Sequence, residues 1–157
     1  MSVFSDTVDF SEAFLYIFDK DQNRVKLIAN PVQKHFLENR SGSDLILKAR
    51  QFGVSTIIQA DYFREAVTRR AVIATIAHDD KTTQKLRRMS ERFYQNLPKV
   101  FKPPVRKYAN TILTVYSDYD SEYEIYTAGN PEGGRGGSYS HIHGSEVAFW
   151  KDAEKLV

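Results

Sequence analysis

The segment LILKARQFGVSTIIQADYF, residues 45–63, decides the predicted fold, because an apolar run passes through a glycine turn into a helix. LILKA (45–49) has the composition of a buried strand, and the helix is predicted from Ser55 to Arg70. A strand, a glycine turn and a helix N-terminus form the arrangement in which backbone N–H groups converge on an anion. The segment therefore favours an α/β fold with a phosphate site after the strand.

The match to the pattern G-x-x-x-x-G-K-[ST] is partial. Gly53 supplies the turn and Ser55 the hydroxyl that would reach magnesium, with Thr56 beside it. Lys48 stands at the first glycine position and Val54 at the usual lysine position. The residues alone leave two interpretations open: a phosphate-binding loop, or an edge strand whose KAR end lies in solvent.

The rest of the chain alternates strands and helices, which predicts a mostly parallel sheet with helices on both faces. AVIATIA (71–77) has the β-branched, continuous character of a central strand. The helix that Asp79 or Asp80 would cap carries one apolar stripe. Further elements are expected as a hairpin of 14–18 with 25–28, a helix from Pro31, strands at 111–116, 123–128 and 138–143, and a helix from Ser145.

Composition limits the class of protein. The chain has 157 residues, which fits one domain, and its net charge is only +2. It has no cysteine, which excludes disulfides and thiolate zinc sites, and the sequence holds no run of about 18 apolar residues that would predict a membrane span. The first residues lack the pattern of a signal peptide. These properties predict a soluble intracellular domain.

Positive charge is concentrated in residues 81–107, where nine basic residues face one acid, Glu91. Such a segment can bind a phosphate backbone without reading sequence. The other interpretation is a solvated helix face followed by a loop.

Four segments in order resemble the large terminase subunits of tailed bacteriophages, the ATP-driven DNA-packaging motors. KARQFGVST resembles their variant phosphate loop, in which the cation precedes the glycine. NPVQKHFL resembles the adenine-reading motif upstream, and AVIATIAHDDKTTQKLRRMSERFYQNLP resembles the strand and helix that follow the loop. GNPEGGRGGSYSHIHGSEVAFWKDA resembles the stretch that carries the catalytic glutamate. The resemblance spans about residues 25 to 157.

The resemblance implies an ASCE-type P-loop NTPase core that binds ATP and Mg²⁺ and hydrolyses the nucleotide to drive viral DNA packaging. Glu146 would orient the attacking water, and Arg50 would act with it by neutralising the phosphates. Ser55 would ligate Mg²⁺. The residues alone leave Glu146 open to a second role, as an acid at a helix start. The implied nucleotide-binding residues are Gln33, which would read adenine, and Lys48, Arg50, Gln51, Gly53, Ser55 and Thr56.

The resemblance also implies a domain organisation and partners. Residues 1–30 would form an N-terminal arm with a hairpin and 31–157 the P-loop core, apparently truncated and without the family's nuclease domain. The partners would be double-stranded DNA, the portal and the small terminase subunit, in a ring-shaped homo-oligomer without membrane contact. The protein would act in the host cytoplasm and transiently at the procapsid portal. The DNA-binding candidates are Arg87, Arg88, Arg92 and Arg135.

Two other classes of function stay open. Val54 and Ser145, which stands where many such motors have an aspartate, favour a nucleotide- or DNA-binding module that does not hydrolyse ATP. The basic segment 81–107 is also compatible with an assembly protein that docks a partner through its basic helix.

Overall fold

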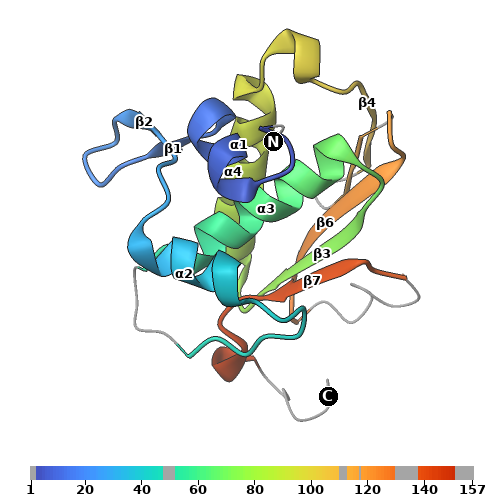
Figure 1. Ribbon diagram of the computed structural model, residues 1–157. Coiled ribbons are helices and arrows are strands. Elements are labelled where there is room, and N and C mark those ends of the chain that lie inside the picture. The colour runs from blue at the N-terminus through green and yellow to red at the C-terminus, as the bar shows by residue number, and fades with distance from the viewer. Residues whose placement is uncertain (1–2, 48–51, 110–112, 117, 130–137, 151–157) are drawn as a thin grey trace.

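A computed structural model describes residues 3–47, 52–109, 113–116, 118–129 and 138–150. Helices lie on one side of a sheet, and a small hairpin projects beyond the helices (Figure 1). The elements are α1 Thr7–Phe14, β1 Tyr16–Phe18, β2 Arg24–Lys26, α2 Pro31–Asn39, α3 Val54–Thr68, β3 Val72–Ala77, α4 Asp80–Asn96, a 3₁₀ turn Lys99–Phe101, β4 Val105–Ala109, β5 Leu113–Tyr116, β6 Ser121–Thr127, β7 His141–Gly144 and a 3₁₀ turn Val147–Phe149.

The main sheet has the strand order β4-β5-β6-β3-β7. β6, β3 and β7 are parallel neighbours, and Ile73 lies opposite Tyr123 on one side and His141 on the other. β4 and β5 add antiparallel pairings. The chain is therefore mixed α/β, with a three-stranded parallel sheet flanked by helices. The parallel prediction holds for two of the four pairings. Within the described residues the helices cover one face of the sheet, where α3 and α4 pack together (Figure 1), so the prediction of helices on both faces is wrong for this part of the chain.

The core lies where α3 meets the sheet and the other helices. Phe63 of α3 is fully buried between Phe10 of α1 and Phe93 of α4, with ring centroids 6.4 and 5.7 Å away. Ile73 of β3 belongs to the same cluster, as do Leu15 and Leu27 beside the hairpin. The predicted N-terminal arm therefore packs on the same core as the rest of the chain.

Helix starts follow the cap residues in the sequence. Asp6 caps α1 by accepting from two backbone N–H groups, and Asp79 caps α4 by accepting from the Thr82 N–H at 2.7 Å. Asn30 and Gln33 form a reciprocal capping box around Pro31 at the start of α2. The predictions for the starts of α2 and α4 are confirmed.

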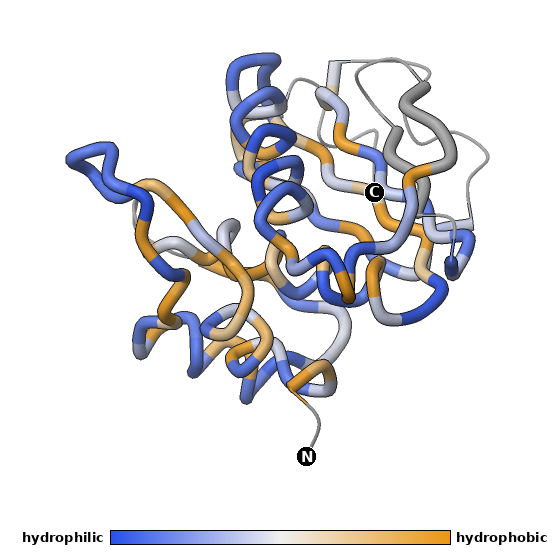
Figure 2. The backbone as a smooth tube through the Cα atoms, turned by 90° about the horizontal axis from the view of Figure 1, so that it is seen from above, coloured by the Kyte–Doolittle hydropathy of each residue, from blue (hydrophilic) through white to orange (hydrophobic). Residues whose placement is uncertain are grey.

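The β1–β2 hairpin is confirmed, with Tyr16 opposite Lys26 and a polar turn between the strands. Figure 2 shows this turn as a hydrophilic tip that extends away from the main body. Among the described helices none is both long and apolar enough to cross a membrane.

Two predictions of secondary structure are wrong, and two elements were not predicted. Residues 45–47 of the predicted strand 45–49 form no strand, and Leu45 and Leu47 are 97% and 101% exposed, because no described strand pairs with them. Up to Trp150, the last described residue, the predicted helix from Ser145 is a single 3₁₀ turn, and Glu146 lies before this turn in a left-handed conformation that a helix cannot include. The sequence patterns also missed α1 and β4.

Candidate functional site

The N-terminus of α3 is the predicted phosphate site. Gly53 stands at the cap with φ 68° and ψ 17°, in the left-handed region that glycine adopts readily. The Gly53 carbonyl accepts the N–H groups of Thr56 and Ile57 at 3.0 and 3.2 Å. No side chain of the described residues caps this helix. The first N–H groups of a helix have no partner within the helix, and such groups can donate to an anion. Ser55 lies half-buried in the first turn, beside Thr56.

Gln33 holds this helix start from the side. Its Nε2 donates to the Gly53 carbonyl at 2.8 Å, and its Oε1 accepts from the Asn30 N–H at 2.9 Å. Asn30 Nδ2 donates in turn to the Phe52 carbonyl at 3.2 Å. Gln33 is only 4% exposed. Both ends of its amide have a protein partner in this conformation, so reading adenine would use the second proton of Nε2 and the second lone pair of Oε1, or an exchange of one partner.

The other predicted phosphate ligands, Lys48, Arg50 and Gln51, lie outside the described residues, as does Arg135 of the glycine-rich loop. Their predicted roles stay predictions. Lys48, Arg50 and Gln51 belong to the connection between α2 and α3, of which Leu47 and Phe52 are the nearest described residues on either side.

The contacts between β7 and α3 place Glu146 relative to Ser55. At the start of β7 the His141 ring packs on Tyr62, with centroids 5.2 Å apart. Two residues later, His143 Nδ1 lies 3.3 Å from Nε2 of Gln59, which is one turn earlier in α3. The strand therefore runs antiparallel to the helix. Its carboxyl end, followed by Glu146, lies toward the helix end that carries Ser55.

Glu146 contacts the end of the neighbouring strand. Its Oε2 lies 3.0 Å from Nδ1 of His78, the residue after β3, at an ion-pair distance but without the alignment of a hydrogen bond. His78 Nε2 lies 3.1 Å from Asp79 Oδ2. The Glu146 side chain is 42% exposed, so water reaches it. Ser145 is buried, and its N–H donates to the Ile76 carbonyl at 2.8 Å, which fixes the end of β7 against β3.

Gln59 is a buried residue that no motif indicated. Its Nε2 donates to Thr75 Oγ1 at 2.9 Å and faces His143, while its Oε1 accepts from Tyr123 and Ser90. Burial raises the pKa of Tyr123 above its ordinary value, so this hydroxyl stays a donor. The amide thus joins α3 to α4 and to three strands. The only sequence signal was a glutamine among apolar residues in VSTIIQADYF.

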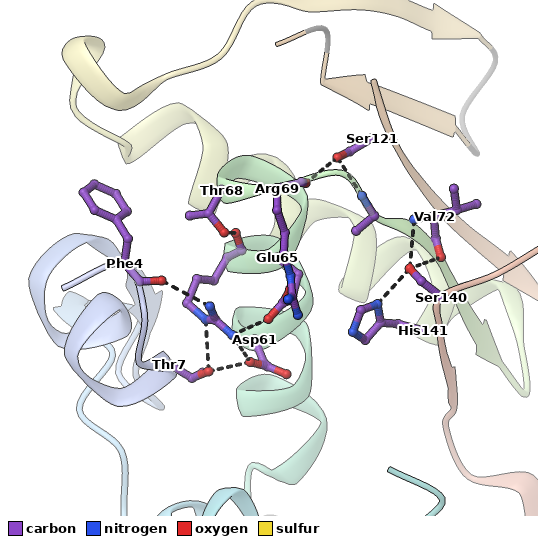
Figure 3. A network of polar contacts seen from close by, with 12 residues as sticks. Phe4, Thr7, Asp61, Glu65, Thr68, Arg69, Val72, Ser121, Ser140 and His141 are labelled. Carbon is purple, nitrogen blue, oxygen red and sulfur yellow. Dashed lines mark hydrogen bonds and ion pairs between the residues drawn. The ribbon is translucent and has the colours of Figure 1, made fainter. Parts of the chain in front are cut away.

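A cluster of buried charges fastens the other half of α3 to the N-terminal segment (Figure 3). Asp61 accepts hydrogen bonds from Thr7, Arg40 and Arg64, and Glu65 accepts from Arg64 and Arg69. Burial by itself raises the pKa of Asp61, but the bonds from Arg40 and Thr7 outweigh it and hold that pKa below its ordinary value. The acidic groups face cations throughout, so the cluster is a structural fastening.

The predicted DNA-binding arginines on α4 have different environments. Arg92 packs over the Phe18 ring at 4.4 Å, and burial lowers its pKa. Arg87 pairs with Glu91 at 2.9 Å, whereas Arg88 is exposed. The cations on α4 that remain open to a phosphate backbone are therefore Arg88 and its exposed neighbours Lys81 and Lys85.

Two histidines on β7 pack against α3. His141 and His143 lie beside Tyr62, and burial lowers the pKa of His141. Among the described residues, no group of three or more His, Cys, Asp or Glu side chains is arranged so that it could hold a metal ion.

Comparison with protein-family models gave no match, and comparison with curated proteins gave none of significant similarity.

Proposed function

We propose that this chain is the ATPase part of a viral DNA-packaging motor of the large-terminase type, which binds ATP with Mg²⁺ and hydrolyses it. One observation carries the proposal: β7 runs antiparallel to α3, so the Glu146 carboxylate lies toward the uncapped helix end that carries Ser55. An anion-binding helix start and a carboxylate at an adjacent strand end are the two elements that phosphoryl transfer to water requires.

Each predicted site residue has a chemical role in this proposal. The first N–H groups of α3 would bind phosphate oxygens, and Gly53 supplies the left-handed turn that precedes them. Lys48 and Arg50 would neutralise the phosphates, and Gln51 and Thr56 belong to the same motif. Glu146 would orient the water and take up its proton as the oxygen attacks the γ-phosphorus and the bond to ADP breaks.

The residues present fit a magnesium ion bound mainly by substrate. Mg²⁺ in phosphoryl-transfer sites takes one or two protein oxygens, substrate phosphates and several waters. Ser55 offers one hydroxyl oxygen in the first turn of α3, which is enough for this kind of site. When bound, the ion would neutralise charge on the phosphates.

The experiment compares ATP binding and hydrolysis, with and without duplex DNA, in the wild type and in two variants. Arg50→Ala should weaken ATP binding in calorimetry. Glu146→Gln should bind ATP at least as tightly as the wild type, since the carboxylate that repels the γ-phosphate is gone. Its hydrolysis should fall by about 10²–10⁴-fold.

Two outcomes would contradict the proposal. If neither the wild type nor Arg50→Ala binds ATP, the phosphate site is wrongly assigned. If the wild type binds ATP or DNA but never hydrolyses the nucleotide, the chain is a binding module.

A second role rests on α4. Lys81, Lys85 and Arg88 are exposed on this helix, which supports contact with the backbone of double-stranded DNA. In the same proposal the protein works in the host cytoplasm at the procapsid portal, in a ring with the small terminase subunit nearby. An assembly protein that docks a partner through α4 would instead show no salt-dependent DNA binding.

A further inference from the structure

The imidazole of His78 lies between two carboxylates at the edge of the sheet. Nδ1 is 3.0 Å from Glu146 Oε2, and Nε2 is 3.1 Å from Asp79 Oδ2. The Nδ1 atom is buried, and within the described residues it has no hydrogen-bond partner with good alignment. The ring also packs near Phe149, with centroids 5.9 Å apart. Glu146 is therefore the polar group that Nδ1 faces.

The fold brings these groups together for a topological reason. β3 and β7 are adjacent parallel strands, so the residues that follow them emerge at the same edge. The bond from the Ser145 N–H to the Ile76 carbonyl keeps the two strand ends in register. Glu146 then adopts φ 57° and ψ 44°, a conformation that residues with a side chain rarely adopt. This backbone turn and the His78 contact together fix where the carboxylate points.

We propose that His78 is a positioning residue for Glu146. The inference rests on the proposed ATPase function and extends it to the group that controls the water-orienting carboxylate. His78 holds one carboxylate oxygen, Oε2, which leaves the other for the attacking water. When both ring nitrogens carry a proton, Asp79 accepts from the opposite nitrogen and so fixes the plane of the ring. A base held by a second group that is itself held by a third is the usual way in which a proton acceptor is oriented.

Two conservative substitutions separate the two sides of the ring. Asn places an amide where Nδ1 lies, so His78→Asn keeps a polar group toward Glu146. Gln places its amide where Nε2 lies, so His78→Gln keeps one toward Asp79. His78→Ala removes both. His35 is an exposed histidine on α2, and His35→Asn is the matched control.

We expect His78→Ala and His78→Gln to lower kcat by about 10–100-fold, the effect of a misplaced reacting group, with KM for ATP changed less than about 2-fold. His78→Asn should recover most of kcat, and His35→Asn should match the wild type. In a Glu146→Gln background the His78 substitutions should have no further effect on kcat, because the group that they position is gone. Circular dichroism and urea unfolding would verify that each variant is folded.

A second measurement needs no turnover. Nitrogen-15 spectra of the His78 ring should show the Nδ1 resonance moving in Glu146→Gln and the Nε2 resonance moving in Asp79→Asn. If the wild type hydrolyses ATP and folded His78→Ala keeps its kcat, the positioning role is wrong while the ATPase proposal stands. Equal loss in His78→Asn and His78→Gln would also overturn it. If the wild type hydrolyses no ATP, with or without DNA, both proposals fail together.

Discussion

Replacing Gln59 by leucine should destabilise the fold strongly, because its amide is fully buried and all four of its hydrogen-bonding positions face polar groups. Leucine keeps a similar volume but leaves the hydroxyls of Thr75 and Tyr123 without this partner. A buried polar group that loses its partner costs about 1–3 kcal/mol. Two such groups give about 2–6 kcal/mol. Ser90 lies within reach of the same network, so we expect the lower half of that range.

Urea unfolding followed by circular dichroism would measure this change as a shift of the midpoint at constant slope. The control is Gln84→Leu, the same substitution at an exposed position of α4. A surface change of this kind should stay within about 0.5 kcal/mol of the wild type. The difference between the two variants isolates the buried hydrogen bonds from the chemistry of the substitution.

A double-mutant cycle tests the cause. Tyr123→Phe removes the hydroxyl that donates to Gln59, so Gln59→Leu with Tyr123→Phe leaves fewer stranded groups than the single changes predict. The double variant should therefore lose less stability than the sum of the two single variants. If Gln59→Leu unfolds at the wild-type midpoint, or if the two changes simply add, the network does not hold α3 against the sheet.

Three further results are expected. Gly53→Ala should cost about 1–2 kcal/mol of stability for the left-handed backbone alone. It should also weaken ATP binding, since the new methyl group would displace the Gln33 side chain that holds the helix start. An unchanged affinity for ATP in calorimetry would contradict this. The pKa of Asp61 is lower in the folded protein than in the unfolded chain, so its contribution to stability is complete above about pH 4 and is lost as the pH falls through the lower folded value. An Asp61→Asn variant should therefore lose stability less steeply on acidification. Parallel curves of stability against pH for the two proteins would refute this. Changing Lys81, Lys85 and Arg88 to Glu should weaken binding to every duplex about equally and flatten its salt dependence, and an unchanged salt slope in fluorescence anisotropy would leave α4 a solvated face.

Much of the fold was predictable because local signals agree with the tertiary structure. The β-branched run at 72–77 is a strand in the parallel part of the sheet, and the apolar stripe after Asp79 packs as α4. Pro31 and Asp79 mark helix starts in the sequence and in the structure. Strand pairing was harder to predict. The antiparallel strands β4 and β5 follow a proline-rich connector, and nothing in their sequence indicates which strand each one pairs with.

The predicted strand at 45–49 shows why an apolar run alone is a weak indicator. A strand needs a neighbour that pairs with its backbone and a layer that covers its side chains. Leu45 and Leu47 have neither among the described residues and remain exposed. The helix that follows forms as predicted, because α3 is held by its own packing and by Gln33 at its start.

The candidate site was predictable only where a motif names its residues. The choice of Ser55 and Glu146 as site residues followed from the order of motifs. The contacts between β7 and α3 bring the start of α3, which carries Ser55, and the end of β7, which precedes Glu146, to the same side of the sheet. His78 lies within one of the resembling segments, but the sequence assigned no role to it or to Gln59, because their contacts are with residues far away in the sequence.

The residues that a motif indicated and the residues that no motif indicated are connected through α3. Gln33 fixes the start of this helix, Gln59 joins its middle to the sheet, and Asp61 fastens it to the N-terminal segment. A shift of α3 along its axis would move Ser55 relative to Glu146, and a misplacement of about 1 Å between reacting groups can lower a rate by about 10²-fold. The polar contacts of α3 therefore affect both the unfolding measurement and the kinetics of ATP hydrolysis. Loss of Gln59 should lower the stability of the fold. In the molecules that remain folded, it should lower kcat before it changes the affinity for ATP.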